Sequence, residues 1–522
     1  MNAEKSQLRA IIRDIGGIQL LIGPILLIPG LVSILYGETY SALSFIISSV
    51  ITTIFGIIAY KSNKKVESNG QSQAMITAAA AWMVTSLFGA LPFFIAAHIT
   101  PVEVAQSFLP AGETYSSSLY NFKSFLHALF ESVSSYTTTG LTMSVHEPSV
   151  GYGLLFYRSF AQWLGGAGMI VLSLAILRQS GGMYGSALYS IEASGQKIRP
   201  NIRQTTQAIW KVYLTVTSLS ALYIFISTWV VFPDYDILEN LFVAVNHAMT
   251  GQSTGGFSTF DDSISGYGSY LMEMIYLLPM ILGAISIPLY YKIYEKGSLK
   301  ELWLDYQGRW LMLLSVIGSA FLVLMLSGIF DFAQSFREGV FQFVSALTTT
   351  GWQTADLSTW PVHATLLMAT IPMIIGGSTG ATVGGIKIFR AYFMAKGFGW
   401  RLKQVTQPSN SIIAMSLGTE RYSYKEISND LMEAYVFSMM YLLVLLGGIL
   451  MSATFMGDNF TLIDAIFESV SAQGTVGLSS GLTSPSMHPV TEVTYIIQML
   501  MGRLELIPIL IMLRSFFNQS KT

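Results

Sequence analysis

The sequence predicts an all-α polytopic membrane protein with ten transmembrane helices, and three observations carry that prediction. Hydrophobic residues make up 52% of the 522 residues and charged residues only 11%, whereas soluble proteins carry about 25% charged residues. Apolar segments long enough to cross a bilayer recur along the whole chain. One short pattern that contains glycine occurs four times, each time between two such segments.

The predicted spans divide into two leading helices and four similar units. The leading helices, near 15–36 and 41–60, are joined by a very short turn. The other eight spans form successive pairs, with one pair in each unit: 74–98 with 152–177, 206–232 with 267–294, 309–330 with 362–397, and 431–456 with 489–514.

Between the members of each pair lies a short apolar segment of about a dozen residues, which is too short to cross a bilayer. We predict that these segments are pore helices: 124–136, 237–249, 335–347 and 460–473. Each ends at one copy of the repeated pattern: ThrThrThrGlyLeu at 137–141, GlnSerThrGlyGly at 252–256, ThrThrThrGlyTrp at 348–352 and GlyThrValGlyLeu at 474–478. Because loop backbone is not stable when it is exposed to lipid, the four loops must face protein or water. Four helix–pore-loop–helix repeats can therefore enclose one central pore.

The repeated pattern is predicted to form a ring of backbone carbonyls around a dehydrated cation. Glycine adopts backbone angles that other residues resist and lets the main chain crowd an axis, while the hydroxyl residues would tie each loop to its pore helix. Small residues also occur where helices merely pack closely, but four copies at matched places favour the filter. The predicted filter residues are Thr138, Thr139, Gly140, Ser253, Thr254, Gly255, Thr349, Thr350, Gly351, Thr475, Val476 and Gly477.

A polar residue stands nine positions before the glycine assigned to each pattern. This spacing places it within the pore helix, where hydrogen bonds to the loop are favoured over direct contact with an ion. The four residues are Glu131, Asn246, Gln342 and Glu468.

A glycine-rich run at 376–387, GlyGlySerThrGlyAlaThrValGlyGlyIleLys, interrupts the predicted span 362–397. Five glycines in ten residues would not keep a helix intact, and a broken membrane helix is tolerated where it lines a cavity. We predict a loop that obstructs the pore below the filter, and a close-packed helix kink is the alternative. The predicted gate residues in the run are Gly376, Gly377, Ser378, Thr379, Gly380, Gly384, Gly385 and Lys387.

Arg503, in the last predicted span, completes the predicted gate. An Arg at membrane depth is costly and faces water or a partner. Facing the pore, it would repel a resting cation and weaken cation binding beneath the filter. The alternative is a buried ion pair, for example with Glu505 or with an acidic residue on a neighbouring helix.

These elements divide the chain into five predicted parts: a two-helix N-terminal extension at 1–70, pore repeat 1 at 71–205, pore repeat 2 at 206–305, pore repeat 3 with the gate loop at 306–428, and pore repeat 4 at 429–522.

Lys and Arg gather at 61–73, 178–205, 292–309 and 396–425. The positive-inside rule therefore places these segments and both termini in the cytoplasm, and the pore loops enter from outside. The outer segments are acidic, which fits either a vestibule that concentrates cations or ordinary loop solubility.

Several functions are excluded or disfavoured. A net charge of −2 gives no support to a nucleic-acid partner, and a chain without cysteine has no thiolate metal site or Cys nucleophile. The six histidines are scattered, and neither an HExxH motif nor paired catalytic carboxylates occur. We therefore expect no enzyme activity and no organic cofactor.

With these motifs, the chain resembles the Trk/Ktr/HKT superfamily of potassium transporters over nearly its whole length, and most of all the TrkH-type potassium uptake subunit. The four pore-loop units, the glycine-rich run in the third unit and GlyArgLeuGlu at 502–505 carry the resemblance, and the two leading helices favour the TrkH type over the shorter Ktr type. Trp352 and Val476 depart from the simplest filter pattern and leave the finer selectivity open.

The resemblance implies potassium uptake across the cytoplasmic (inner) membrane, with potassium as the transported ion. It also implies a homodimer with one pore in each protomer, embedded in the lipid bilayer and regulated by a cytosolic nucleotide-binding subunit of the TrkA/KtrA type that binds NAD or ATP/ADP. A sodium-conducting member, or a symporter coupled to protons or sodium, is the alternative. In this family Ser at the first filter glycine accompanies sodium preference, and this chain has Gly140 there.

Overall fold

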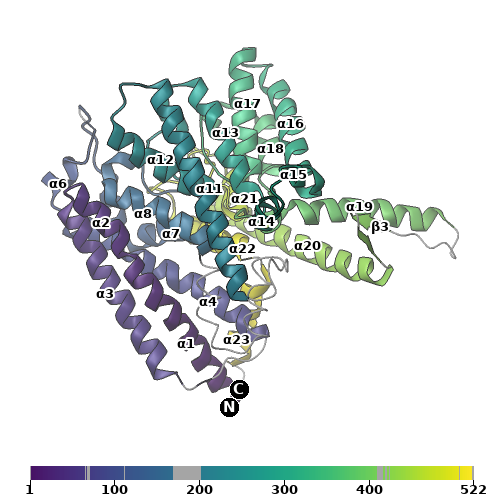
Figure 1. Ribbon diagram of the computed structural model, residues 1–522, viewed down its shortest axis with the longest axis horizontal. Helices are drawn as coiled ribbons and strands as arrows, with labels where there is room; N and C mark the ends of the chain where they lie inside the picture. The colour runs from purple at the N-terminus through teal and green to yellow at the C-terminus, as the bar shows by residue number, and fades with distance from the viewer. Residues whose placement is uncertain are drawn as a thin grey trace.

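The computed structural model describes residues 2–64, 66, 71–110, 112–168, 202–407, 415–417, 420–422, 424–504 and 506–519. Over these residues the chain is mostly helical, as Figure 1 shows. Six described helices are long and apolar enough to cross a membrane, and counting each of two bent helix pairs as one span gives eight. The prediction of a multi-pass helical membrane protein is therefore confirmed, whereas the number of ten spans stays a prediction.

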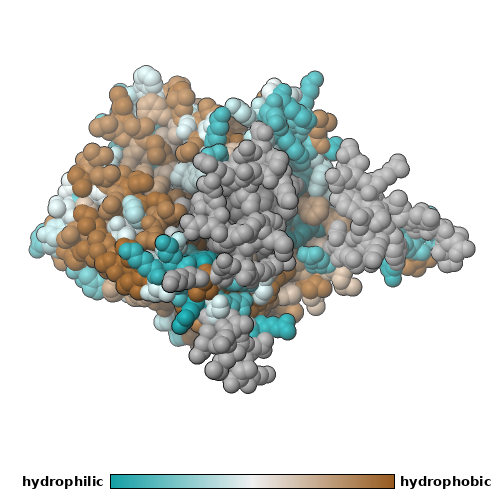
Figure 2. All heavy atoms as spheres, turned by 60° about the horizontal axis from the view of Figure 1, so that its bottom comes forward, coloured by the Kyte–Doolittle hydropathy of each residue, from teal (hydrophilic) through white to brown (hydrophobic). Residues whose placement is uncertain are grey.

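Large apolar side chains cover the outside of these helices. Leu35 on α2 (Leu27–Leu35) is 82% exposed, and Val316 and Leu324 on α16 (Tyr306–Leu326) are each 70% exposed. Figure 2 shows broad hydrophobic areas on one face of the molecule, with the hydrophilic residues gathered in smaller patches. Exposed apolar area of this extent is unfavourable in water but suits a surface that faces lipid tails.

The chain opens with two membrane helices that pack side by side. The first is broken near Pro24 into α1 (Asn2–Ile25) and α2 (Leu27–Leu35), and the second is α3 (Thr39–Ser62). Gly16 of α1 and Gly56 of α3 lie where any side chain would collide with the backbone of the facing helix. Small residues of this kind let membrane helices approach closely.

Four helix groups follow, which we call units 1 to 4. Unit 1 contains α4 (Gln71–Gly89), α5 (Leu91–Ile99), α6 (Val102–Gln106), α7 (Phe125–Tyr136) and α8 (Tyr152–Trp163). Unit 2 contains α11 (Ile202–Val231), α12 (Ile237–Gln252), α13 (Tyr270–Ala284) and α14 (Ile287–Lys296). Unit 3 contains α15 (Lys300–Leu304), α16 (Tyr306–Leu326), α17 (Phe332–Leu347), α18 (Val362–Thr370) and α19 (Ile388–Thr406). Unit 4 contains α20 (Tyr424–Phe455), α21 (Leu462–Gly474), α22 (Pro489–Arg503) and α23 (Leu506–Gln519).

The four units close into a ring. The helix that follows the short helix in each unit packs against the short helix of the next unit: α8 against α12, α13 against α17, α18 against α21, and α22 against α7. The last of these contacts joins unit 4 back to unit 1. The short helices thus bring the loops at their C-terminal ends toward a common centre.

Two of these four seams hold a contact between a basic and an acidic side chain at equivalent places. Arg337 of α17 pairs with Glu273, the fourth residue of α13, and His127 of α7 lies 2.9 Å from Glu492, the fourth residue of α22. Glu273 and Glu492 are both fully buried. Removing one partner of a buried pair leaves an uncompensated charge, which is strongly destabilising, so these pairs favour the observed order of the units.

Several predicted spans are bent or broken in the structure. The segment 267–294 bends by 93° between α13 and α14, and 489–514 bends by 114° between α22 and α23. The span 362–397 is broken as predicted, since α18 ends at Thr370 and α19 begins at Ile388. The span 152–177 begins as α8 and continues as the π-helical turn η3 (Leu164–Gly168), while 169–201 lies outside the described residues.

The chain is also not purely helical. In the break between α18 and α19, β1 (Ile375–Gly376) pairs in parallel with β2 (Ile386–Lys387). Beyond α19, β3 (Met415–Leu417) pairs with β4 (Glu420–Tyr422) in antiparallel register. Figure 1 shows α19 and α20 as a long hairpin that extends to one side of the helix cluster, with β3 beside it.

Glu38, in the turn between α2 and α3, anchors the leading helices to unit 1. It is 5% exposed, and its carboxylate accepts hydrogen bonds from the main-chain N–H groups of Tyr152 (2.5 Å) and Gly153 (3.0 Å) at the start of α8. The first N–H groups of a helix have no partner within the helix, so this carboxylate caps α8 from another element and stabilises the docking.

We therefore expect Glu38→Ala to lower the thermal stability of the purified protein. Each buried N–H group left without an acceptor costs about 1–3 kcal/mol. Glu38→Gln keeps one acceptor oxygen and should lose less. Melting in detergent, followed by size-exclusion chromatography, provides the measurement. Equal melting temperatures for Glu38→Ala and the parent would show that this contact does not hold the leading helices.

Candidate functional site

Four loops meet at the centre of the ring, and their glycines interlock with one another. A side chain at Gly140 would collide with the carbonyl of Gly255, and one at Gly256 would collide with the carbonyl of Thr350. In the same way Gly351 faces the carbonyl of Val476, and Gly477 faces the carbonyl of Thr139. The contacts run from unit 1 to 2, from 2 to 3, from 3 to 4 and from 4 back to 1, so each glycine makes room for a carbonyl of the next unit.

The loops share an unusual backbone conformation. One threonine in each loop has a positive φ: Thr138 (55°), Thr254 (51°), Thr349 (51°) and Thr475 (50°). Two residues later comes a glycine that also has a positive φ: Gly140 (94°), Gly256 (78°), Gly351 (81°) and Gly477 (92°). A β-branched residue rarely adopts positive φ, and such strain costs of order 1–3 kcal/mol at each position. Its recurrence at four matched positions indicates a functional constraint.

This geometry corrects the predicted register of the second loop. Gly256, and not Gly255, is the equivalent of Gly140, because Gly256 has the positive φ and packs against the next unit. Gly255 occupies the position of Thr139, since each of the two donates its N–H to the carbonyl five residues earlier in its own short helix. The pattern GlnSerThrGlyGly contains two adjacent glycines, and spacing alone aligned the wrong one. Thr254 is correspondingly the equivalent of Thr138.

With the register corrected, the residue nine positions before each glycine braces its loop. Glu131 accepts hydrogen bonds from the N–H of Met143 (2.8 Å) and from the Thr142 hydroxyl (3.0 Å). Glu468 accepts from the N–H of Ser480 (2.9 Å) and from the Ser479 hydroxyl (2.5 Å). In both units the bonds therefore reach the second and third residues after the glycine.

Units 2 and 3 use neutral side chains for the same purpose. His247 Nε2 accepts the N–H of Thr259 (3.2 Å) and lies 3.2 Å from the Ser258 hydroxyl, and the amide of Gln342 donates to the Thr354 hydroxyl (3.3 Å). The predicted brace Asn246 instead donates to a carbonyl within its own helix (2.7 Å). The nine-residue spacing leads to His247 from Gly256 and to Asn246 from Gly255, so the predicted register concealed the role of His247.

Further side chains fix the loops from behind. Gln162 of α8 donates to the carbonyl of Gly255 (2.5 Å) and accepts from the N–H of Phe257 (3.2 Å). Trp352 is fully buried beside Tyr276 of α13, so its indole packs away from the ring of glycines. Nothing in the sequence pattern pointed to Gln162, which lies in a different unit from the loop that it supports.

The hydroxyl residues have two roles. The Ser253 hydroxyl donates to the carbonyl of Met249 (2.8 Å). The Thr139 hydroxyl is hydrogen-bonded to that of Thr137 (2.8 Å), and the Thr350 hydroxyl to that of Thr348 (2.9 Å). These hydroxyls therefore tie the loops to the short helices, as predicted. The hydroxyls of Thr138 and Thr475 are buried and, within the described part of the chain, have no hydrogen-bond partner. A buried polar group without a partner is costly, and a bound cation would satisfy these two oxygens.

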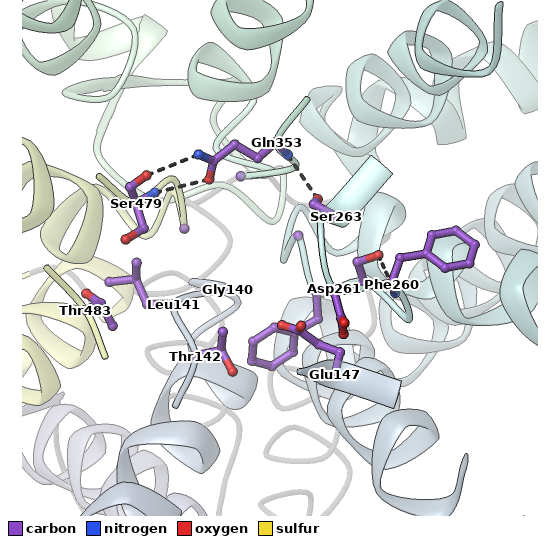
Figure 3. Close-up of a pocket in the computed structure, with 15 residues that line it drawn as sticks. Gly140, Leu141, Thr142, Glu147, Phe260, Asp261, Ser263, Gln353, Ser479 and Thr483 are labelled. Carbon is purple, nitrogen blue, oxygen red and sulfur yellow. Dashed lines mark hydrogen bonds between the residues drawn. The ribbon is translucent and has the colours of Figure 1, made fainter. Parts of the chain in front are cut away.

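A cavity of about 150 Å³ opens directly above the ring, and all four glycines that have positive φ line it. Figure 3 shows side chains from all four units around it. Of the acidic residues expected in the outer segments, Glu147 and Asp261 reach this cavity. The other polar lining residues are Thr142, Ser258, Ser263, Gln353, Ser479 and Thr483.

The glycine-rich loop contacts the opposite end of the four loops. The Thr382 hydroxyl lies 3.2 Å from the hydroxyl of Thr254, and the N–H of Gly384 donates to the Thr349 hydroxyl (3.4 Å). A side chain at Gly384 would also collide with the Thr475 hydroxyl. The loop thus touches three of the four threonines that have positive φ.

Other contacts hold this loop in place. The N–H of Ser378 donates to the carbonyl of Ala284 (3.2 Å), and the carbonyl of Gly380 accepts from the N–H of Ile287 (3.1 Å) at the 93° bend of unit 2. The N–H of Thr379 donates to the Gln307 side chain (2.8 Å). At the base of the loop, Gly376 and Lys387 are partners in the β1–β2 pairing. The carbonyl of Gly377 accepts the N–H of Ile388 (3.2 Å), and Gly385 has a positive φ of 67°.

Arg503, at the end of α22, connects this loop to unit 1. Its guanidinium donates to the carbonyl of Thr382 and to the carbonyls of Gly165 (2.9 Å) and Gly166 (2.8 Å). The guanidinium thus clamps the glycine-rich loop to unit 1, a role that the sequence did not indicate, while its repulsion of a cation in the pore stays a prediction. Glu505, the predicted alternative partner, lies outside the described residues.

Comparison with known proteins gives one consistent family. The family model of the TrkH cation transport proteins matches residues 71–522. TrkH of the Trk potassium uptake system from Escherichia coli K12 is 28% identical, covering 98% of this chain and 99% of the relative. The corresponding protein of Halomonas elongata is 30% identical over 79% of each chain. The crystal structure of the potassium transporter TrkH from Vibrio parahaemolyticus superimposes with a TM-score of 0.78 at 25% identity, covering 97% of this chain and 98% of that one.

The corrected register predicts different effects for two adjacent substitutions. Gly256→Ala places a side chain against the carbonyl of Thr350 at a positive φ, which costs about 1–2 kcal/mol for the conformation and about 1–3 kcal/mol for the overlap. At Gly255→Ala the three nearest atoms belong to the end of the Gln162 side chain, which can shift at the expense of its hydrogen bonds to the loop. We expect much lower folded yield and melting temperature for Gly256→Ala. If Gly255→Ala is the more damaging of the two, the original alignment is right.

Proposed function

Since this chain belongs to the TrkH family of cation transport proteins, we propose that it takes up potassium ions across the cytoplasmic membrane through one pore at the centre of units 1 to 4. The single observation that supports this proposal most strongly is the closed ring of glycines and carbonyls. Relatives that match this chain over nearly its whole length are named potassium uptake proteins.

The backbone of the ring suits a dehydrated cation. In each loop a residue of ordinary φ stands between a threonine and a glycine that have positive φ, and such alternation turns successive carbonyls toward the same side. Four loops would then present several layers of carbonyl oxygens, which replace the water around potassium. The unpartnered hydroxyls of Thr138 and Thr475 would add oxygen ligands at the inner end. The twelve residues of the predicted filter, together with Gly256, belong to this proposal.

The driving force would be the membrane potential. Moving one positive charge inward through the field is worth about 2.3 kcal/mol per 100 mV, which corresponds to roughly fiftyfold accumulation. The proposed orientation has both termini in the cytoplasm and the loops entering from outside, following the distribution of Lys and Arg in the sequence.

The glycine-rich loop would act as the gate. It contacts Thr254 and Thr349 at the end of the ring opposite the outer cavity, so an ion leaving the filter would meet it. We assign the gate to residues 376–387 with Arg503. Control would come from a cytosolic nucleotide-binding partner of the TrkA/KtrA type, acting on a homodimer, because the relatives are named as members of the Trk system.

A sodium-conducting or ion-coupled transporter is the second candidate. The observation that favours potassium is a glycine at the matched position of all four loops, including Gly140 in unit 1. A serine there would place its side chain against the carbonyl of Gly255 and distort the ligand cage.

Gly140→Ser tests the filter. We expect labelled rubidium uptake into proteoliposomes to fall and the ratio of sodium to rubidium uptake to rise at least tenfold, because about 1.4 kcal/mol of lost discrimination is a factor of ten. Gly457→Ser is the matched control, since a side chain at Gly457 meets nothing within 4 Å, and it should behave like the parent. An unchanged sodium-to-rubidium ratio in folded Gly140→Ser protein would remove the ring from the selectivity mechanism.

Arg503→Gln tests the gate. It removes a positive charge near the inner end of the proposed filter together with the clamp on Thr382, so maximal rubidium flux should rise severalfold while the rubidium-to-sodium ratio stays constant. Arg503→Lys keeps the charge but lacks the fork that reaches several carbonyls. If the maximal rubidium flux of Arg503→Lys equals that of the parent protein, the rise in flux in Arg503→Gln is due to the lost charge. If Arg503→Lys also has a raised flux, the rise is due to the lost clamp. A slow Arg503→Gln protein of low melting temperature would contradict the gate and indicate a structural role.

A further inference from the structure

The cavity above the ring contains an acidic side chain that lacks a full set of partners. Glu147, in the short 3₁₀ turn η2 (Glu147–Val150), is only 8% exposed. Its Oε2 atom has no hydrogen-bond partner among the described residues, and the residue lines the cavity. An unpartnered carboxylate oxygen that is nine-tenths buried is costly, so its place in the cavity wall calls for a ligand.

The nearest basic group does not satisfy this carboxylate. Arg158 Nη2 lies 3.6 Å from Glu147 Oε1, which is outside hydrogen-bond distance. The same guanidinium donates from Nε to Glu131 (2.7 Å) and from Nη2 to the Thr142 hydroxyl (2.9 Å). Arg158 therefore forms its hydrogen bonds with the brace of the first loop and makes only a longer ion-pair contact with Glu147 Oε1, which leaves Glu147 Oε2 without a partner among the described residues.

A second carboxylate lines the same cavity. Asp261 follows the second filter loop and lies 3.3 Å from Nδ1 of His146. Figure 3 shows Glu147 and Asp261 on the same side of the cavity, with their carboxylates toward one another. Units 3 and 4 contribute neutral groups instead, among which the Gln353 amide donates to the carbonyl of Ser479 (3.2 Å). Negative charge is thus concentrated beside units 1 and 2.

We propose that Glu147 and Asp261 form an outer site for a hydrated potassium ion, which loads the ion before it loses its water and enters the ring. This inference rests on the proposed function and adds a binding site to it. A cavity of about 150 Å³ has room for an ion with several waters, because one water occupies about 30 Å³. The four glycines in its floor place an ion held there directly above the filter.

Protons should compete with the ion at this site. The pKa of the Glu147 carboxyl is raised to about 8 because burial raises it more than the neighbouring Arg158 lowers it, and the charges of Asp261 and Glu131 contribute to the rise. A raised carboxyl pKa means that the group is charged above about pH 8 and gains a proton as the pH falls, so the affinity for the ion weakens toward acid pH. The titratable and charged groups around it are Arg158, Glu131, Asp261, His146, Tyr115 and Glu113.

The test measures initial uptake of rubidium into proteoliposomes against external rubidium concentration at pH 8.5. Glu147→Gln should raise the half-saturating concentration about tenfold, which is the scale on which a charged cleft concentrates ions, and leave the maximal rate and the rubidium-to-sodium ratio unchanged. Asp261→Asn should shift the half-saturating concentration in the same direction. Lowering the pH to 6.5 should weaken apparent affinity in the parent and change it little in Glu147→Gln.

Asp262→Asn is the matched control, because it removes one negative charge from the adjacent exposed residue, which does not line the cavity. The proposed site would be overturned if both Glu147→Gln and Asp261→Asn had the same half-saturating rubidium concentration as the parent protein. It would also be overturned if Asp262→Asn shifted this concentration as much as Glu147→Gln does. If Glu147→Gln fails to fold, Asp261→Asn alone decides the question. A parent that takes up no rubidium at all would instead refute the proposed function, so the two failures are distinguishable.

Discussion

The hydrogen bonds between each short helix and its own loop are the interaction on which the centre of this protein depends. Each loop carries a threonine and a glycine that have positive φ, and such strain persists only where the surroundings hold it in place. In each unit a buried polar residue nine positions before the glycine holds the loop in this conformation. It forms hydrogen bonds with the backbone or hydroxyl groups of the second and third residues after the glycine. The ring of glycines is therefore shaped by contacts within each unit, to which Gln162 adds a contact between units 1 and 2.

The four braces reach one geometry by different chemistry. Glu131 has Arg158 as a counter-charge, whereas Glu468 is surrounded by neutral donors, including the Thr483 hydroxyl (2.7 Å). His247 accepts a main-chain N–H at Nε2, so its Nδ1 carries the proton and donates to the hydroxyl of Tyr276 (2.6 Å). The fourfold ring is thus symmetric in backbone and asymmetric in charge. The outer cavity is asymmetric as well, since its two carboxylates, Glu147 and Asp261, belong to units 1 and 2.

Sequence periodicity predicted the short helices to within three residues and identified the loops, because both depend on local patterns. It failed where the outcome depends on distant packing. Sequence alone does not distinguish the two adjacent glycines in GlnSerThrGlyGly, whereas in the structure the positive φ of Gly256 and its contact with Thr350 do so. Gln162 could not be found either, since its partner Gly255 is 93 residues away. The bends after α13 and α22 escaped notice because apolar composition continues through them.

The glycine-rich loop is coupled to more of the molecule than its position alone suggests. At one end Ser378 and Gly380 are hydrogen-bonded to the 93° bend between α13 and α14, and Arg503 links its centre to units 1 and 4. At the other end β2 continues without interruption into α19, which forms the hairpin that projects from the helix cluster in Figure 1. Since a helix transmits displacement along its axis, a shift of α19 would move Lys387 and the loop together. If this loop is the proposed gate, it would leave the ring only by breaking contacts with these elements, so its opening would require a rearrangement of several units and not the motion of one flexible segment.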